Sequence, residues 1–162
     1  KRGLDVFTTN AELISKENIK KDFEVIWANN IFEHLLSPHH FLIRLRSVSK
    51  DGTVLVLGVP VVPKIFSLIN LSKFRGSLAS NHINFFTKDT LKLTVERSGW
   101  KILETRPFFS KFKLTDNLLG FLSPHIYIVA EKDLVFKYPE KKVLEWKGED
   151  YYEEILKMTD QK

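Results

Sequence analysis

A polar break in an apolar run is the first place where this chain could do chemistry. The run Phe23–Ala28 is mainly apolar, the small amides of Asn29-Asn30 follow it, and the pair Glu33-His34 comes three residues later. Such a break places short polar groups at the carboxyl end of a buried strand, where open α/β sheets bind ligands. An ordinary strand-to-helix turn gives the same pattern. The surrounding elements must therefore decide between a ligand site and a plain turn.

The next segments predict a helix and a second buried strand. Ser37 can cap a helix that has Pro38 at its first position, and Asp51-Gly52 ends it. Thr53–Val59 is a β-branched apolar run, as expected of a buried strand. The apolar residues that recur at helical spacing after Pro38 are Phe41, Leu42, Leu45 and Val48. The order is strand, helix, strand, as in a parallel α/β unit.

A second helix and a further strand follow a long connection. Thr87 can cap a helix that Gly99 terminates, and Trp100 opens the strand after it. The connection Val61–Asn81 has an apolar middle flanked by cations. It is either a mobile lid or a plain packing helix.

Together these pieces resemble the C-terminal two-thirds of a class I S-adenosylmethionine-dependent methyltransferase, in the branch of the ubiquinone-biosynthesis O-methyltransferases. The resemblance covers about residues 1–133. The segments that carry it, in order, are FEVIWANNIFEHL, SVSKDGTVLVLGVP, NHINFFTKDTL, SGWKILET and SPHIYIVAEKD. None of these motifs is specific alone, but their order and spacing together are characteristic of the family.

The resemblance implies a fold, a domain division and an activity. The fold is α/β, a Rossmann-like methyltransferase sheet that is mostly parallel, with SPHIYIVAEKD as an antiparallel last strand beside the fifth, and without the first two strands. Residues 1–133 would be a partial methyltransferase domain, and residues 134–162 an extension with a terminal helix at Gly148–Met158. The implied activity is methyl transfer from S-adenosylmethionine to a small molecule.

The family's cofactor contacts are only partly present. The glycine-rich loop and the acidic residue that binds the ribose have no counterpart, and Gly3–Phe7 resembles the family's third strand. Asn10 stands where an acidic residue is usual. The chain therefore looks like a fragment, from which we expect weak or absent cofactor binding. The cofactor-binding residues that the resemblance implies are Asn10, Ala11, Ala28, Asn29 and Asn30, predicted to lie together at one rim of the sheet.

Two histidines are candidate catalytic residues by the same resemblance. His34 follows the strand end near the methionine moiety, and His82 opens the segment at the mouth of the active site. An imidazole titrates near neutrality, so either could take a proton from a substrate hydroxyl. In the alternative, His34 closes the turn with Glu33 and His82 holds the loop. His125 is interpreted as structural.

No metal site is predicted. Glu33, His34, His39 and His40 are close in sequence, but they straddle the helix start at Pro38, so their side chains should diverge. The spacing His-x-x-x-His is missing as well.

Composition limits the remaining possibilities. The 162 residues are 43% hydrophobic with no cysteine, which suits one domain without disulfides or thiolate chemistry. The net charge of +5 is dispersed, so nucleic-acid binding is disfavoured. No apolar run reaches about 18 residues, so we expect no membrane span and a cytoplasmic protein. The alternative to an enzyme is a noncatalytic remnant that acts as an interaction module, and an exposed sheet edge could make the chain a homo-oligomer.

Overall fold

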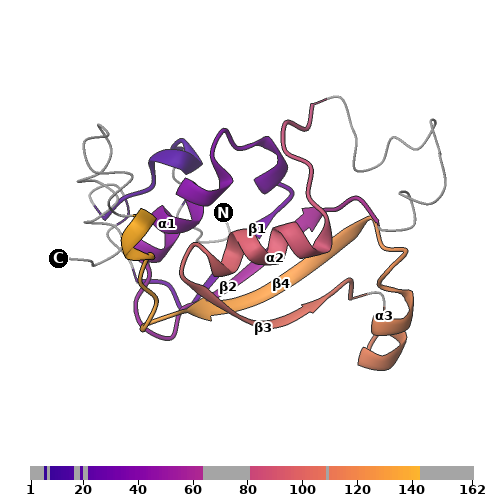
Figure 1. Cartoon of the computed structure of the whole chain (residues 1–162). Helices are drawn as coiled ribbons and strands as arrows, with labels where there is room; N and C mark the ends of the chain where they lie inside the picture. Colours follow the sequence, from indigo (N-terminus) through magenta and orange to yellow (C-terminus); the bar gives the residue numbers. More distant parts are fainter. Residues whose placement is uncertain are drawn as a thin grey trace.

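Four strands form a single mixed sheet in the order β1-β2-β4-β3 (Figure 1). The computed structural model describes residues 6, 8–16, 19, 22–63, 81–108 and 110–142. The strands are β1 (Val25–Asn29), β2 (Val54–Pro60), β3 (Trp100–Arg106) and β4 (His125–Lys132). β1 pairs with β2 in parallel, whereas β4 is antiparallel to both β2 and β3. Three strands thus run one way and the last one runs the other, which confirms the predicted fold.

Several predicted segments lie outside the described residues. These are the strand at Gly3–Phe7, apart from Val6, the middle of the connection at residues 64–80, and the terminal helix at Gly148–Met158. The division of the chain at residue 133 stays a prediction.

The helix α1 (Pro38–Val48) begins where the sequence predicts. The hydroxyl of Ser37 accepts a hydrogen bond from the His40 amide, and Pro38 occupies the first turn, where its missing N–H costs nothing. The four residues predicted to face the core are all buried, namely Phe41, Leu42, Leu45 and Val48.

The helix α2 (Lys88–Glu96) has a reciprocal cap at its start. Thr87 and Thr90 exchange side-chain and backbone hydrogen bonds, and Gly99, with φ of +79°, closes the turn after the helix. Leu91 and Val95 are buried against the sheet. α1 and α2 lie on the same face of the sheet (Figure 1). Burial of apolar side chains between them and the strands is the main force holding this layer in place.

The described chain has three further short helices, η1 (Ala11–Leu13), η2 (Phe32–His34) and α3 (Lys113–Leu119), none of which was predicted as a helix from the sequence. Residues 140–142 are helical as well. α3 has no side-chain cap at Phe112, so it lacks the usual start signal. Buried Asp116 stabilises the helix instead. Its Oδ1 accepts a hydrogen bond from the Ser110 amide at 2.9 Å, and its Oδ2 lies 3.7 Å from Nη1 of Arg106 in β3. No helix in the described ranges is long and apolar enough to span a bilayer.

The strand register brings three chain segments together where β1 and β2 end and β4 begins, which we call the active-site edge. Asn29, the last residue of β1, is opposite Gly58 of β2, and Pro60 at the end of β2 is opposite His125 at the start of β4. The carboxyl ends of the two parallel strands therefore meet the beginning of the antiparallel one.

Candidate active-site edge

The residue after β1 adopts a left-handed backbone that only a few residue types tolerate. Asn30 has φ of +52°, its amide donates to the Gly58 carbonyl at 3.0 Å, and its side-chain oxygen lies 2.9 Å from Nε2 of His125. With an amide oxygen as acceptor, Nε2 of His125 carries the proton. Burial lowers the pKa of His125, and the charge of Glu33 opposes this in part. A neutral histidine therefore fixes the polar end of β1.

The backbone of the buried Glu33 binds the segment that begins at His82. Glu33 in η2 is only 1% exposed, and its backbone carbonyl accepts from the amides of both Ile83 and Asn84 at 3.0 Å. The side-chain amide of Asn84 also donates to the Leu35 carbonyl at 2.6 Å. These bonds place the segment that begins at His82 beside η2, although about fifty residues separate the two in sequence.

The two candidate histidines meet at this carboxylate. Oε1 of Glu33 lies 3.8 Å from Nε2 of His34 and 4.0 Å from Nε2 of His82, and the rings meet edge-on with centroids 5.0 Å apart. The Asn81 carbonyl lies 3.1 Å from Nδ1 of His34, and a carbonyl only accepts, so Nδ1 carries the proton and Nε2 the lone pair. We name Glu33, His34 and His82 the Glu-His-His cluster. It can accept a proton and pair the resulting charge with a carboxylate.

The same cluster has a donor set that a divalent ion could use. The ligand atoms of its three residues lie within 4.8 Å of one another, and one carboxylate with two imidazoles is a common set for zinc and iron. The sequence analysis did not include His82 among the possible metal ligands, because it comes from a distant segment. His39 points elsewhere, since its Nε2 contacts the Arg97 carbonyl and the Tyr138 hydroxyl. The absence of a metal site stays a prediction.

The five residues predicted to bind cofactor have different surroundings. Ala28 is buried in the core and Ala11 packs against it, whereas Asn29 is exposed at the end of β1. Asn10 caps η1, because its side-chain oxygen accepts from the Glu12 amide at 2.9 Å. Their joint position at one rim and their role in cofactor binding stay predictions.

Glu12 joins η1 to the chain that follows η2. Its carboxylate accepts from the Leu36 amide at 3.2 Å and from the Ser37 amide at 2.7 Å. η1 is therefore fastened beside the start of α1 rather than to the strand end itself.

Glu33 and His125 were not among the predicted site residues. Glu33 was considered as a turn partner of His34 and as a metal ligand that its position argues against, and His125 was interpreted as structural. The predicted insertion of the last strand beside the fifth could have placed His125 next to the end of β2. No local pattern gives the burial of Glu33, which depends on the return of residues 81–86.

The sheet order, with antiparallel β4 between two strands that run the same way, matches the fold of class I S-adenosylmethionine-dependent methyltransferases. A family model described as a methyltransferase domain matches residues 5–105, which is more than half of the chain. The chain belongs to this family. A search of the curated proteins found no match to it.

Solved structures with the same fold are distant in sequence. A protein of Bacillus halodurans C-125 assigned to the methyltransferases is 15% identical with a TM-score of 0.52, over 76% of this chain and 69% of that one. An O-methyltransferase family protein of Burkholderia thailandensis is 11% identical with a TM-score of 0.52, and the match covers 80% of this chain and 36% of that protein. The CurJ carbon methyltransferase is 18% identical with a TM-score of 0.49, and the match covers 76% of this chain and 34% of that protein. The chain thus spans about a third of the length of two of these proteins.

Proposed function

We propose that this chain is the acceptor-side part of an enzyme that methylates a small molecule with S-adenosylmethionine. The observation that carries the proposal is the Glu-His-His cluster, in which one buried carboxylate faces two imidazoles beside the carboxyl end of β1. Membership in the methyltransferase family supports the reaction type. The ubiquinone-type branch and the identity of the acceptor stay predictions.

The residues of the edge fit one side of such a cofactor. Asn29 is exposed there, whereas the side-chain oxygens of Asn10 and Asn30 are already engaged by the Glu12 amide and by His125. The backbone around Asn29 and Asn30 is therefore the part we assign to cofactor contact. When bound, S-adenosylmethionine supplies an electrophilic methyl group on a sulfonium sulfur.

The role of the cluster is to remove a proton from the acceptor. A hydroxyl that gains a methyl group must lose its proton, and Nε2 of His34 or His82 is the atom we assign to receive it. Oε1 of Glu33, within 4.0 Å of both nitrogens, then pairs with the imidazolium. Much of the remaining rate acceleration comes from holding the acceptor in line with the methyl group, because orientation of two bound reactants lowers the entropic part of the barrier.

Calorimetric titration of the 162-residue chain with S-adenosylmethionine tests the fragment hypothesis. We expect weak binding or none, because the glycine-rich loop and the ribose-binding acid have no counterpart in the sequence. Micromolar binding by a monomer would contradict this.

The reading frame upstream of Lys1 tests the proposal that the chain is part of an enzyme. A glycine-rich strand-loop segment there would support it, and the longer protein should lose more turnover than cofactor affinity when His82 becomes Ala. Equal losses of turnover and affinity would assign His82 a structural role.

A noncatalytic interaction module is the second candidate. Val25 and Trp27 of β1 are 57% and 65% exposed, so an apolar part of the sheet is available to a partner, including a second copy of the chain. A start codon immediately before Lys1 would favour this function.

A further inference from the structure

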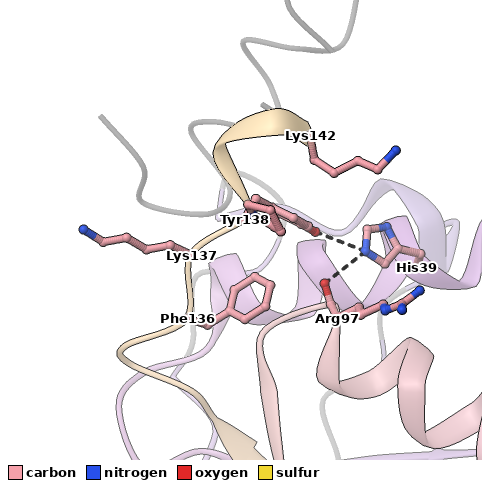
Figure 2. A pocket seen from close by; sticks show the side chains of 7 residues that line it. His39, Arg97, Phe136, Lys137, Tyr138 and Lys142 are labelled. Carbon is pink, nitrogen blue, oxygen red and sulfur yellow. Dashed lines mark hydrogen bonds between the residues drawn. The ribbon is translucent and has the colours of Figure 1, made fainter. Parts of the chain in front are cut away.

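A cavity of about 480 Å³ lies away from the active-site edge (Figure 2). Its walls come from three places: His39 in the first turn of α1, Arg97 just after α2, and the segment after β4 that includes Phe136 and Tyr138. Arg97 precedes the start of β3, where Trp100 pairs with Lys132 at the end of β4. The cavity is therefore near the opposite ends of the strands from Asn29. We name it the Tyr138 cavity.

Three rings give the Tyr138 cavity a fixed aromatic wall. The ring of Phe136 meets that of Tyr138 nearly perpendicularly, with centroids 5.2 Å apart, and His39 meets Tyr138 edge-on at 6.0 Å. Nε2 of His39 lies 3.1 Å from the Tyr138 hydroxyl and 3.3 Å from the Arg97 carbonyl, as the dashed lines of Figure 2 mark. Tyr138 is only 7% exposed. Hydrogen bonds and burial thus hold the rings in place before any ligand arrives, which lowers the entropic cost of binding.

The charged groups that line the cavity are cations as far as the described residues go. Among these residues the lining includes Arg97, Lys137 and Lys142 and no carboxylate. In Figure 2 the side chains of Arg97 and Lys142 lie on the same side as His39, whereas Lys137 points away. Arg97 forms no ion pair with any acidic residue in the described ranges. The cavity therefore combines apolar rings with a guanidinium that pairs with no acidic residue of the described chain.

This combination selects a ligand class. A planar ring can pack against Phe136 and Tyr138, and a carboxylate can form two parallel hydrogen bonds with the planar guanidinium of Arg97. A volume of about 480 Å³ is within the usual range for small-molecule sites. The guanidinium of Arg97 would repel an aromatic cation, and an uncharged aromatic ring would form no charge-assisted hydrogen bond with it.

We propose that the Tyr138 cavity is a binding site for a small aromatic carboxylate, with the ring against Phe136 and Tyr138 and the carboxylate on Arg97. This site is separate from the Glu-His-His cluster, so it does not depend on methyl transfer.

Calorimetric titration of the 162-residue chain with 2-naphthoate, and with uncharged 2-naphthamide as an isostere, tests the proposal. We expect saturable binding of 2-naphthoate and at least tenfold weaker binding of 2-naphthamide, because a charge-assisted hydrogen bond pair is lost. Arg97→Gln should weaken 2-naphthoate binding about tenfold and leave 2-naphthamide unchanged. Lys50→Gln, an exposed cation just after α1 and outside the cavity, is the matched control and should change neither.

Phe136→Ala separates the ring contact from the charge contact. It should weaken both probes by similar factors, and its thermal unfolding midpoint shows whether the variant is folded. The proposal is overturned if 2-naphthoate does not bind saturably to the parent chain, if the two probes bind equally, or if Arg97→Gln and Lys50→Gln have the same effect.

Discussion

At the scale of the residue, Glu33 carries a buried carboxylate oxygen without a hydrogen-bond partner. Oε1 faces two imidazoles, whereas Oε2 has no partner and the residue is 1% exposed. Leaving such an atom unpaired costs about 1–3 kcal/mol, more when the group is charged. A protein that keeps this arrangement gives up stability in return for a carboxylate at that position, as is common at functional sites.

The first prediction concerns Glu33→Gln. The amide removes the buried charge, so we expect the free energy of unfolding to rise by about 1 kcal/mol, or about 2–4 °C in the midpoint. Thermal unfolding measures this. Glu12→Gln is the matched control, because both oxygens of Glu12 accept backbone hydrogen bonds, and the same change should there lower stability. A loss of stability at both positions would contradict the interpretation of Glu33.

A second prediction concerns pH. Burial lowers the pKa of His39 from its usual 6.5, and burial likewise lowers the pKa values of His40 and His125. The unfolded chain therefore binds protons more readily than the folded one below pH about 6.5, and stability must fall as the pH decreases through this range. Urea unfolding should give a lower midpoint at pH 5.5 than at pH 7.5, and His39→Gln should reduce that difference. An unchanged difference in the variant would show that His39 does not contribute.

Sequence reasoning proposed part of the candidate site, and the roles of these residues stay predictions. Asn29-Asn30 and His34 were proposed from a break in the hydrophobic pattern and from the family resemblance, and His82 from the resemblance. Glu33 and His125 were not, because their roles depend on contacts between distant segments, such as Asn30 with His125 and Glu33 with residues 82–84. Periodicity along the chain carries no information on such pairs.

At the scale of the element, the packing of Tyr127 of β4 against position 58 of β2 requires a glycine there. A Cβ at position 58 would collide with the side chain of Asn29 and lie 2.6 Å from the ring of Tyr127. Asn29 is exposed and can rotate, but Tyr127 is held by ring contacts with Trp27, Phe108 and His125. The close packing of these rings therefore restricts position 58 to glycine.

The third prediction is that Gly58→Ala lowers the free energy of unfolding by about 2 kcal/mol, the cost of overpacking a tight site. Gly52→Ala provides the contrast, since a Cβ there meets nothing within 4 Å and only the φ of +80° opposes it. We expect that loss to be about 1 kcal/mol. Chemical unfolding of both variants measures the difference, and an equal or smaller loss for Gly58→Ala would show that Tyr127 can move at little cost.

The helices were predictable where a side chain marks their ends. Ser37, Thr87 and Gly99 set the ends of α1 and α2, and each acts through a local hydrogen bond or backbone angle that the sequence alone specifies. α3 was missed because Asp116 stabilises it from within, through Ser110 and Arg106. Tertiary contacts of this kind override weak local propensity.

At the scale of the whole molecule, β1 is the exposed end of the described sheet. It pairs only with β2 among the described strands, and Val25 and Trp27 are more than half exposed. An apolar strand with an open edge is a template for pairing with another chain.

The fourth prediction is therefore self-association. Light scattering should give a mass that rises with protein concentration, and Trp27→Lys should shift the chain toward the monomer, since a lysine opposes edge pairing. Leu118→Lys on α3 is the control, because Leu118 is 70% exposed but lies outside the sheet, and it should not change the mass. A monomer at every concentration, or equal effects of the two lysines, would contradict an interface at β1.

The central position of β4 has a consequence for synthesis on the ribosome. β2 pairs with β1 and β4, and β3 pairs with β4 alone, so β3 has no place in the sheet until the residues of β4 have been made. At about 5–20 residues per second, several seconds pass between the completion of β2 and that of β4. During that time β2 has an open edge where β4 will pair, and β3 has no neighbour, so the second half of the sheet can form only after β4 has been made.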